Sequence, residues 1–240
     1  EVSVNKEEFE YQIQNQKIWD IKRRGKWLQF VLDDYFLLSH LRMEGKYFLK
    51  SPKEERLKHE HVTFFLDSKE ELRYHDTRKF GRMYLIKKEM IDDCKPLKQL
   101  GLEPWDESLT TSYLLSQYKK KKLPIKTVLL DQSIIAGIGN IYADEILFLS
   151  KINPYKVTNT LTKKDCMNII TNTKQVLEKA IALGGTTIRS YTSSEGVHGR
   201  FQNELFIHGK ESCSLCGLSV KKDFIGGRGT YYCEKCQRKR

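Results

Sequence analysis

The chain has 240 residues and carries 42 Lys and Arg against 31 Asp and Glu, a net charge of +11. Such an excess of positive charge favours a polyanionic partner, with nucleic acid as the leading candidate. Hydrophobic residues make up 39% of the sequence, enough for a folded core, and no stretch resembles a membrane span or a signal peptide. Cys94 and Cys166 are isolated, which indicates free thiols in a reducing compartment. We therefore expect a cytoplasmic protein without a membrane partner.

Short apolar stretches separated by turns follow one another over residues 1–88. Strands are expected at residues 26–32, 35–41, 46–49, 61–66 and 72–74. Turns such as Asp33-Asp34 and Glu44-Gly45 separate them. Short strands at this spacing predict a β-sandwich or a barrel, and residues 100–105 are expected to form the linker that follows it.

After this linker the apolar residues recur at helical spacing. Helices are expected over residues 112–118, 124–130 and 140–149, and from Thr162 to Gly184-Gly185. Asp165, three residues after Thr162, completes a capping box at the start of the last helix. In the helix over residues 140–149, the apolar side chains share one face, and Asp144 and Glu145 lie on the other.

A glycine-rich turn over residues 137–139 leads into that helix, with Asn140 at the expected N-cap. Such a turn exposes backbone N–H groups where the helix dipole favours an anion. The lysine run at residues 119–122 and Lys126 stand just upstream. The expected anion is therefore a phosphate of a nucleic-acid backbone, and an ordinary tight turn between packed helices is the alternative.

Two CxxC pairs stand near the C-terminal end of the chain, with sixteen residues between them; their cysteines are Cys213, Cys216, Cys233 and Cys236. Four thiolates complete a tetrahedral shell, and paired motifs at this spacing are a strong signal for zinc, with two disulfides or unrelated thiols as the alternative. Strand-like residues 219–225 and 230–232 flank a glycine-rich tip that contains Arg228. We predict a β-hairpin closed at its base by one structural Zn²⁺, with Arg228 held against a partner.

Several motifs occur in one order along the chain. They are Lys22-Arg23-Arg24-Gly25-Lys26, His40-Leu41-Arg42-Met43-Glu44-Gly45, Asp76-Thr77-Arg78-Lys79-Phe80-Gly81, the segments 137–143 and 184–187, and the CxxC pairs. Together they resemble the formamidopyrimidine-DNA glycosylase family of bifunctional repair enzymes, which remove 8-oxoguanine and ring-opened purines. The resemblance implies an α+β multidomain fold: a β-sandwich over residues 1–105, a helix–two-turn–helix domain over 106–205 and a zinc finger over 206–240. It also implies a monomer that acts on damaged double-stranded DNA.

The resemblance assigns chemical roles to individual residues. Lys26 corresponds to a catalytic lysine near the abasic sugar, a proton donor in β-elimination. Arg228 corresponds to a finger arginine that serves δ-elimination and phosphate binding. Residues 186–201 correspond to a loop that closes over the flipped base. The implied reaction is base flipping, attack of an amine on C1′, an imine intermediate and successive β- and δ-elimination, which makes the family DNA glycosylases with apurinic/apyrimidinic (AP) lyase activity.

Further residues correspond to positions that contact DNA. Met43, Arg78 and Phe80 resemble the three residues that fill the gap left by the flipped nucleotide, where apolar wedges hold the stack open and an arginine donates to the widowed cytosine. The implied phosphate-binding and DNA-binding positions are His59, Arg78, Lys121, Lys126 and Asn140. Core packing is the alternative for Met43 and Phe80.

Two features depart from the family pattern. His208 stands where the family usually has tyrosine, which is expected to alter one DNA contact. The family's nucleophile is the amine of an N-terminal proline in a Pro-Glu-Leu-Pro-Glu opening, whereas this chain begins Glu1-Val2-Ser3-Val4. We therefore expect residues 1–240 to be an N-terminally shortened form that lacks glycosylase activity.

Two other functions remain open at this point. One is a related glycosylase that prefers oxidised pyrimidines, against which the segment Arg78-Lys79-Phe80 argues because it matches the purine-lesion branch of the family. The other is a non-catalytic zinc-containing protein that binds DNA or RNA, which the missing N-terminal amine would favour.

Overall fold

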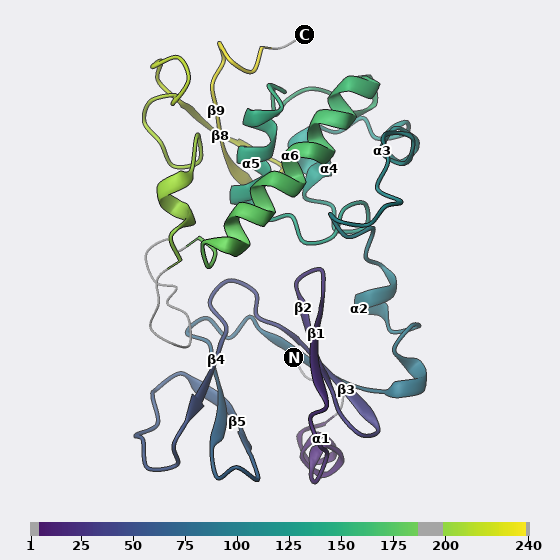
Figure 1. Ribbon diagram of the computed structural model, residues 1–240, viewed down its shortest axis with the longest axis vertical. Helices are drawn as coiled ribbons and strands as arrows, with labels where there is room; N and C mark the ends of the chain where they lie inside the picture. The colour runs from purple at the N-terminus through teal and green to yellow at the C-terminus, as the bar shows by residue number, and fades with distance from the viewer. Residues whose placement is uncertain (1–4, 187–198, 239–240) are drawn as a thin grey trace. The chain divides into compact units, whose positions relative to one another are not determined.

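The computed structural model describes residues 5–186 and 199–238. These residues form two compact units: the first holds the residues up to Lys98 together with Gly199, and the second holds Gln99–Thr186 and the residues from Arg200 on (Figure 1). The second unit holds both the helices and the C-terminal hairpin. None of the helices in the described ranges is both long enough and apolar enough to cross a bilayer.

The first unit is a sandwich of two antiparallel sheets, as predicted. One sheet has the strand order β1 (Asp20–Arg24), β2 (Trp27–Val31), β3 (Tyr35–His40) and β7 (Arg82–Lys87). The other has the order β4 (Lys46–Lys50), β6 (Glu71–His75) and β5 (Glu60–Phe65). Helix α1 (Lys6–Ile13) precedes the sheets, and a 3-10 turn η1 (Lys88–Met90) and helix α2 (Lys95–Lys98) follow them.

The core of the sandwich takes residues from both sheets and from helix α1; its buried members are Phe9, Phe30, Leu32, Leu37, Tyr74, Met83 and Leu85. The sequence-based prediction of strands throughout residues 1–88 missed α1, which Asn5 caps by accepting from the Glu8 backbone N–H. Only Phe9 of this helix is buried, so the sequence lacks the apolar stripe that would have marked it.

The second unit is built on four helices and a hairpin: α3 (Thr111–Tyr118), α4 (Ile125–Leu129), α5 (Asn140–Leu149), α6 (Lys163–Ala182), β8 (Lys221–Ile225) and β9 (Arg228–Tyr232), with 3-10 turns η2 (Thr158–Thr160) and η3 (Phe201–Glu204). The long helix α6 packs against α5 and α3 (Figure 1). The predicted capping box is confirmed, because Thr162 Oγ1 accepts from the Asp165 backbone and the Asp165 carboxylate accepts from Thr162. The helix stops ahead of Gly184, whose φ of 71° suits glycine.

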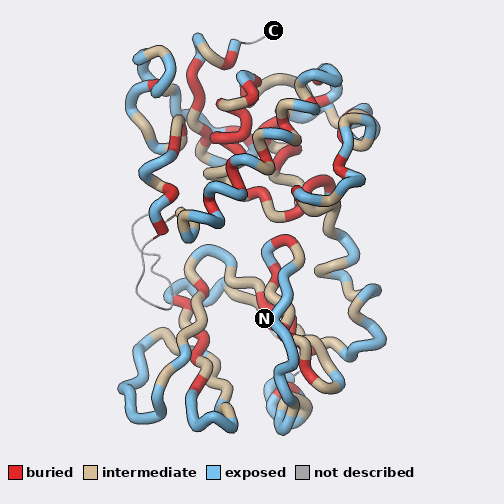
Figure 2. The backbone as a smooth tube through the Cα atoms, in the orientation of Figure 1, coloured by how far each residue is buried: buried red, intermediate tan, exposed pale blue. Residues whose placement is uncertain are grey.

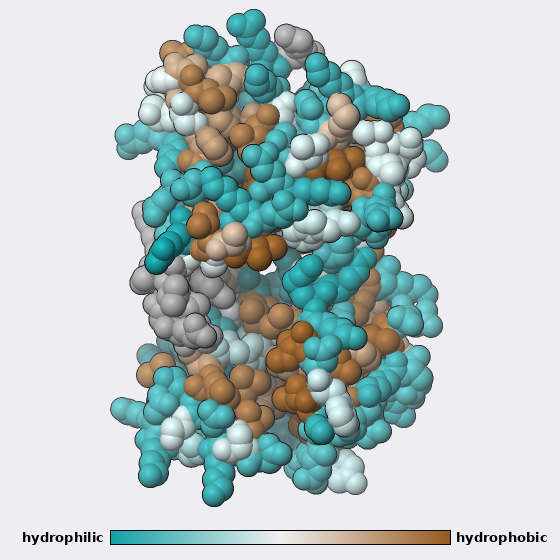
Figure 3. All heavy atoms as spheres, viewed as in Figure 1, coloured by the Kyte–Doolittle hydropathy of each residue, from teal (hydrophilic) through white to brown (hydrophobic). Residues whose placement is uncertain are grey.

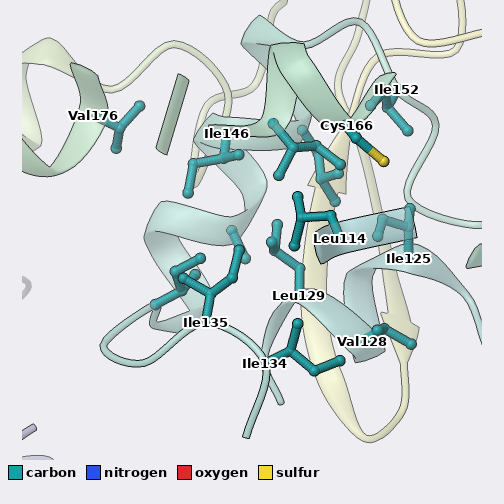
Figure 4. Packing of buried hydrophobic residues seen from close by; sticks show 14 of the residues in the cluster. Leu114, Ile125, Val128, Leu129, Ile134, Ile135, Ile146, Ile152, Cys166 and Val176 are labelled. Atoms are coloured by element: carbon teal, nitrogen blue, oxygen red, sulfur yellow. The ribbon is translucent and has the colours of Figure 1, made fainter. Parts of the chain in front are cut away.

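A continuous apolar cluster fills the space between these helices. Leu114, Leu129, Ile146, Cys166 and Val176 converge in it from α3, α4, α5 and α6 (Figure 4). Burial follows the helix faces, so that α6 alternates between buried and exposed residues along its length (Figure 2). Hydrophilic residues cover most of the visible outer face of this unit (Figure 3). The core therefore gives a rigid base for the polar groups described next.

Candidate nucleic-acid interface and metal centre

Met43, Arg78 and Phe80 lie together on the surface of the first unit, and we call them the gap-filling cluster. Arg78 Nη1 lies 3.0 Å from Met43 Sδ, and the guanidinium carbon lies 4.6 Å from the centre of the Phe80 ring. Met43 is 64% exposed and Phe80 is 52% exposed, which excludes the alternative of core packing. The three residues come from two loops, the one after β3 and the one before β7.

Asp76 shapes the loop that carries Arg78 and Phe80. Its buried carboxylate accepts from the backbone N–H of Arg78 at 3.0 Å and of Gly81 at 2.9 Å, and from the Tyr74 hydroxyl at 3.2 Å. Burial alone would raise the pKa of Asp76, but these donors outweigh it and lower the pKa. Gly81 has no room for a side chain, since a Cβ would stand 1.7 Å from the Tyr74 hydroxyl. Sequence reasoning named this motif but missed the role of its first residue.

Two other predicted residues lie on the sandwich. Lys26 is exposed in the turn between β1 and β2, and its charge acts on His40, whose pKa falls to about 4 through burial and then through Arg42 and Lys26. His59 is half-buried, and its carbonyl oxygen accepts from the Asp76 backbone N–H at 3.0 Å. The turn that carries His59, just before β5, is thus hydrogen-bonded to the loop that carries Arg78 and Phe80.

In the second unit, the glycine-rich turn lies against the C-terminal hairpin. Helix α5 begins at Asn140 with Gly139 as its N-cap, so the prediction of Asn140 as the cap is wrong by one residue. Asn140 instead uses its side chain, whose Nδ2 donates to the Gly229 carbonyl oxygen at 2.9 Å. Arg228 precedes Gly229, is exposed, and is the first residue of β9. The structure therefore brings the predicted residues Asn140 and Arg228 close together.

Lys126 does not lie where a phosphate contact would need it. The side chain is fully buried, and Nζ donates to Asp144 Oδ1 at 2.6 Å and to the Asn140 carbonyl oxygen at 2.8 Å. Burial lowers the pKa of Lys126, although Asp144 opposes the shift. The prediction of a phosphate contact is corrected accordingly: the ammonium group supports the turn from inside. Lys121 remains partly exposed, paired with Asp131 at 3.2 Å.

The polar face of α5 is covered rather than solvated. Glu145 accepts from the three backbone N–H groups of residues 206–208, at 2.7, 3.0 and 2.8 Å. Asp144 Oδ2 accepts from His208 Nδ1 at 2.6 Å and from the Tyr231 backbone N–H at 3.2 Å. Burial raises the pKa of Glu145, and the backbone donors oppose that rise. The sequence placed both carboxylates opposite the apolar face but gave no sign that the hairpin would cover them.

The four cysteines of the CxxC pairs converge at the base of the hairpin. Their Sγ atoms all lie within 4.8 Å of one another, and Cys213 and Cys233 are buried. None of the four forms a disulfide in the structure, where the Sγ atoms lie 3.5 Å apart in Cys216–Cys233 and 3.8 Å apart in Cys213–Cys236. Four sulfur donors at this separation fit one tetrahedral metal ion with no open position.

Gln237 anchors this metal centre to the helices, a role that sequence reasoning missed. The side chain is buried: Oε1 accepts from the Cys233 backbone N–H at 3.0 Å and Nε2 donates to the Ile152 carbonyl oxygen at 2.9 Å. Asn153 Nδ2 donates to the Gln237 carbonyl oxygen at 2.7 Å. A lone glutamine next to a cysteine motif gives no sequence signal of such contacts.

Most of the predicted base-capping loop, residues 187–198, lies outside the described residues, as do residues 1–4. The two ends that are described lie close to each other. Thr186 Oγ1 donates to the Tyr142 hydroxyl at 3.2 Å, and the Phe201 backbone N–H donates to the Gly185 carbonyl oxygen at 3.1 Å. The described residues on either side, Thr186 and Phe201, therefore both lie against Tyr142 of helix α5.

Two known sequence families match the chain. The formamidopyrimidine-DNA glycosylase N-terminal domain matches residues 1–83, and the formamidopyrimidine-DNA glycosylase H2TH domain matches residues 100–192. The formamidopyrimidine-DNA glycosylase of Oceanobacillus iheyensis is 47% identical over 235 residues, which is 96% of this chain and 83% of the relative. That of Bacillus subtilis is 44% identical over 98% of this chain and 86% of the relative.

Solved structures agree with these relatives. A complex between the Lactococcus lactis Fpg and an abasic site containing DNA has a TM-score of 0.91 and 41% identity, covering 97% of this chain and 86% of that chain. A complex of the same enzyme with a Fapy-dG containing DNA has a TM-score of 0.90 and 40% identity, with the same coverage. Likeness at this level extends through both units of the fold described above. The chain belongs to the formamidopyrimidine-DNA glycosylase family.

Proposed function

We propose that this protein recognises and removes oxidised purines, 8-oxoguanine and formamidopyrimidines, from duplex DNA. The observation that carries this proposal is the exposed gap-filling cluster of Met43, Arg78 and Phe80. A sulfur atom, a guanidinium and an aromatic ring at one surface provide wedges for an opened base stack together with a hydrogen-bond donor for the opposite base. The net charge of +11 and the complexes of the L. lactis relative with damaged DNA support the same function.

Arg78 is well suited to read the base left without a partner. Its guanidinium has five N–H donors, and the contact that its Nη1 makes is with the thioether of Met43, which is a weak acceptor. Little is therefore lost when Nη1 turns to a cytosine carbonyl oxygen or ring nitrogen. Asp76 holds the Arg78 backbone in place, so the side chain moves on a fixed base.

The second unit supplies the phosphate contacts in this proposal. Asn140 at the start of α5 offers its backbone N–H and the second hydrogen of Nδ2, since Gly229 takes the first. Arg228, next to Gly229 in the chain, and Lys121 are cations of this unit that remain accessible. Lys126 contributes only by holding the Asn140 carbonyl oxygen.

The AP lyase step follows the chemistry of the family. An amine attacks C1′ of the deoxyribose and the base leaves with the C1′–N bonding electrons and a proton. The C1′–O4′ bond then opens, O4′ takes up a proton, and C1′ is left as an imine with the attacking amine. Removal of a C2′ proton then breaks the C3′–O bond, and a second elimination breaks the C5′–O bond. We assign proton donation near the sugar to Lys26 and phosphate binding during δ-elimination to Arg228, which are both exposed.

We propose that the metal at Cys213, Cys216, Cys233 and Cys236 is zinc. A shell of four thiolates suits this ion, and its closed tetrahedral geometry gives a structural role. When bound, the metal supplies folding energy to the hairpin rather than chemistry at the sugar. The position of β9, and with it Arg228, depends on this closure.

Arg78→Ala is expected to reduce the preference for a lesion opposite cytosine, because the opposite base loses its donor. Lys121→Ala is expected to weaken binding to all duplexes alike and to lower the salt slope by about 1, as for a single phosphate contact. Both are measured as affinities for duplexes that carry an abasic-site analogue opposite each of the four bases, at several salt concentrations. Equal losses of affinity in both variants, whichever base stands opposite the abasic-site analogue, would contradict the assignment of Arg78 to the opposite base.

A polypeptide of residues 1–240 alone is expected to bind duplex DNA but not to form an imine with a lesion-containing duplex. The family uses the secondary amine of an N-terminal proline for this attack, whereas such a polypeptide offers the primary amine of Glu1 and the exposed side chain of Lys26 instead. Borohydride trapping measures this reaction. The positive control is a chain extended at its N-terminus with the segment of a relative that begins Pro-Glu-Leu-Pro-Glu. Efficient trapping by residues 1–240 would contradict the expectation, and mapping of the cross-link would identify the amine.

A further inference from the structure

We propose that Asp144 and His208 form a positioning pair, which holds Arg228 at a fixed separation from the glycine-rich turn and Asn140. The proposal rests on the DNA-binding function proposed above. In it neither member of the pair touches DNA. Both act through the backbone of strand β9, and their effect on binding is exerted by way of Arg228.

The Asp144 carboxylate connects three segments that are distant in sequence. Oδ1 accepts from Lys126 of helix α4 at 2.6 Å. Oδ2 accepts from His208 Nδ1 at 2.6 Å and from the Tyr231 backbone N–H of β9 at 3.2 Å. The side chains of Asp144 and Lys126 are both fully buried. A buried carboxylate with these three donors has few alternative positions, because any shift leaves charge unpaired.

The hairpin is fixed on both sides of Arg228. Tyr231 is held by Asp144, and the Gly229 carbonyl oxygen accepts from Asn140 Nδ2 at 2.9 Å. On the other side, the backbone of Gly226 lies so close to helix α4 that a Cβ there would be 2.8 Å from Thr127 Oγ1. Arg228 itself stays exposed between these anchors. Its backbone therefore has little freedom while its side chain faces solvent.

His208 occupies the position of a tyrosine that is usual in the family, but the structure shows an inward-facing residue. Its side chain is 12% exposed, and its ring lies edge-on to Tyr231 with the centres 4.7 Å apart. Because the Asp144 carboxylate only accepts, Nδ1 must carry the proton that it donates. The ring thus fixes Asp144 from one side and β9 from the other. In this proposal His208 alters a DNA contact by way of β9 and Arg228.

The test compares His208→Phe with His208→Asn in the zinc-loaded chain of residues 1–240, each with and without Arg228→Ala. Phenylalanine keeps the ring and loses the donor, whereas the asparagine amide restores a donor near the place of Nδ1. We expect His208→Phe to weaken binding of a duplex with an abasic-site analogue about tenfold, the scale of one charge-assisted hydrogen bond. We expect His208→Asn to restore most of the affinity.

The Arg228→Ala background separates the pair from a direct contact. If His208 acts through Arg228, His208→Phe costs no further affinity once the arginine is removed. An equal loss in both backgrounds overturns the proposal, and so does unchanged affinity of His208→Phe in the Arg228 background. Thermal melting and zinc content must show that each variant is folded and zinc-loaded at the temperature of the binding assay, which excludes unfolding as the cause of a loss.

A second measurement needs no DNA. Amide hydrogen exchange at Tyr231 is expected to be faster in His208→Phe than in His208→Asn, because the carboxylate that holds this N–H loses one of its fixed contacts. Equal exchange in the two variants overturns the positioning role. If the parent chain fails to bind duplex DNA, the proposed function is contradicted. The exchange rates still decide whether Asp144 and His208 hold the hairpin.

Discussion

Lys126→Met is expected to lower the free energy of unfolding of the second unit by about 3–5 kcal/mol, the usual range for removing one partner of a buried ion pair. Methionine fills nearly the same volume but leaves Asp144 without its closest cation, at a site where both side chains are fully buried. The Asn140 carbonyl oxygen also loses its donor. Chemical denaturation followed by helical circular dichroism measures this loss, because the long helices belong to the second unit.

A matched control comes from the same unit. Lys121 pairs with Asp131, but their side chains are 39% and 33% exposed, so Lys121→Met is expected to cost less than about 1 kcal/mol. The double variant Lys126→Met with Asp144→Asn is expected to recover part of the loss, because the uncompensated charge is gone. Equal destabilisation by Lys126→Met and Lys121→Met would contradict a structural role for the buried pair.

Removal of the metal is expected to have the other large effect. Cys233→Ser, or a strong chelator, is expected to disorder β8 and β9 and to abolish measurable DNA binding, because a hairpin this small has too little core of its own. Structural zinc contributes on the order of 10 kcal/mol in small metal-dependent modules, well above what the remaining hydrogen bonds of the hairpin supply. Nuclear magnetic resonance of the hairpin amides, together with elemental analysis, measures the loss.

Cys94→Ser is the control for this prediction. Cys94 is a free thiol in the first unit, outside the four-cysteine cluster. Its substitution by serine is therefore expected to leave both the zinc content and the hairpin unchanged. Freshly purified parent chain without zinc would contradict the assignment of the metal. A hairpin that keeps its order after chelation would contradict the structural role.

Much of the fold could be predicted from local patterns in the sequence. The strand residues of β2 to β6, the capping box at Thr162 and the CxxC pairs each have a signal within a few positions, so spacing alone located them. Helix α1 and strand β1 lack such a signal: α1 buries one side chain, and β1 buries none of its five fully. β1 is a strand because it pairs with β2, and the residues of β1 themselves give no sign of this pairing.

The sequence could place a residue of the candidate site only where that residue lies at the surface. Met43, Arg78 and Phe80 are exposed, and motif order alone was enough to name them. Lys126 carries the same motif signal, but its environment depends on Asp144, eighteen positions away. Charge and spacing could not show that this lysine is enclosed. Asp76 and Gln237 were missed for a related reason, because their partners are backbone groups that every residue type supplies.

The hydrogen bonds that hold the hairpin connect residues 84 to 89 positions apart in the chain. A ribosome therefore delivers helix α5 long before the strand that covers it, and Asp144 and Glu145 face water in the meantime. Helix α6, with its local capping box, forms early, whereas contacts of such wide separation close late. Residues 206–238 thus join the fold after the helices that they cover. We expect a nascent chain to gain affinity for DNA only after this segment has emerged and taken up its metal.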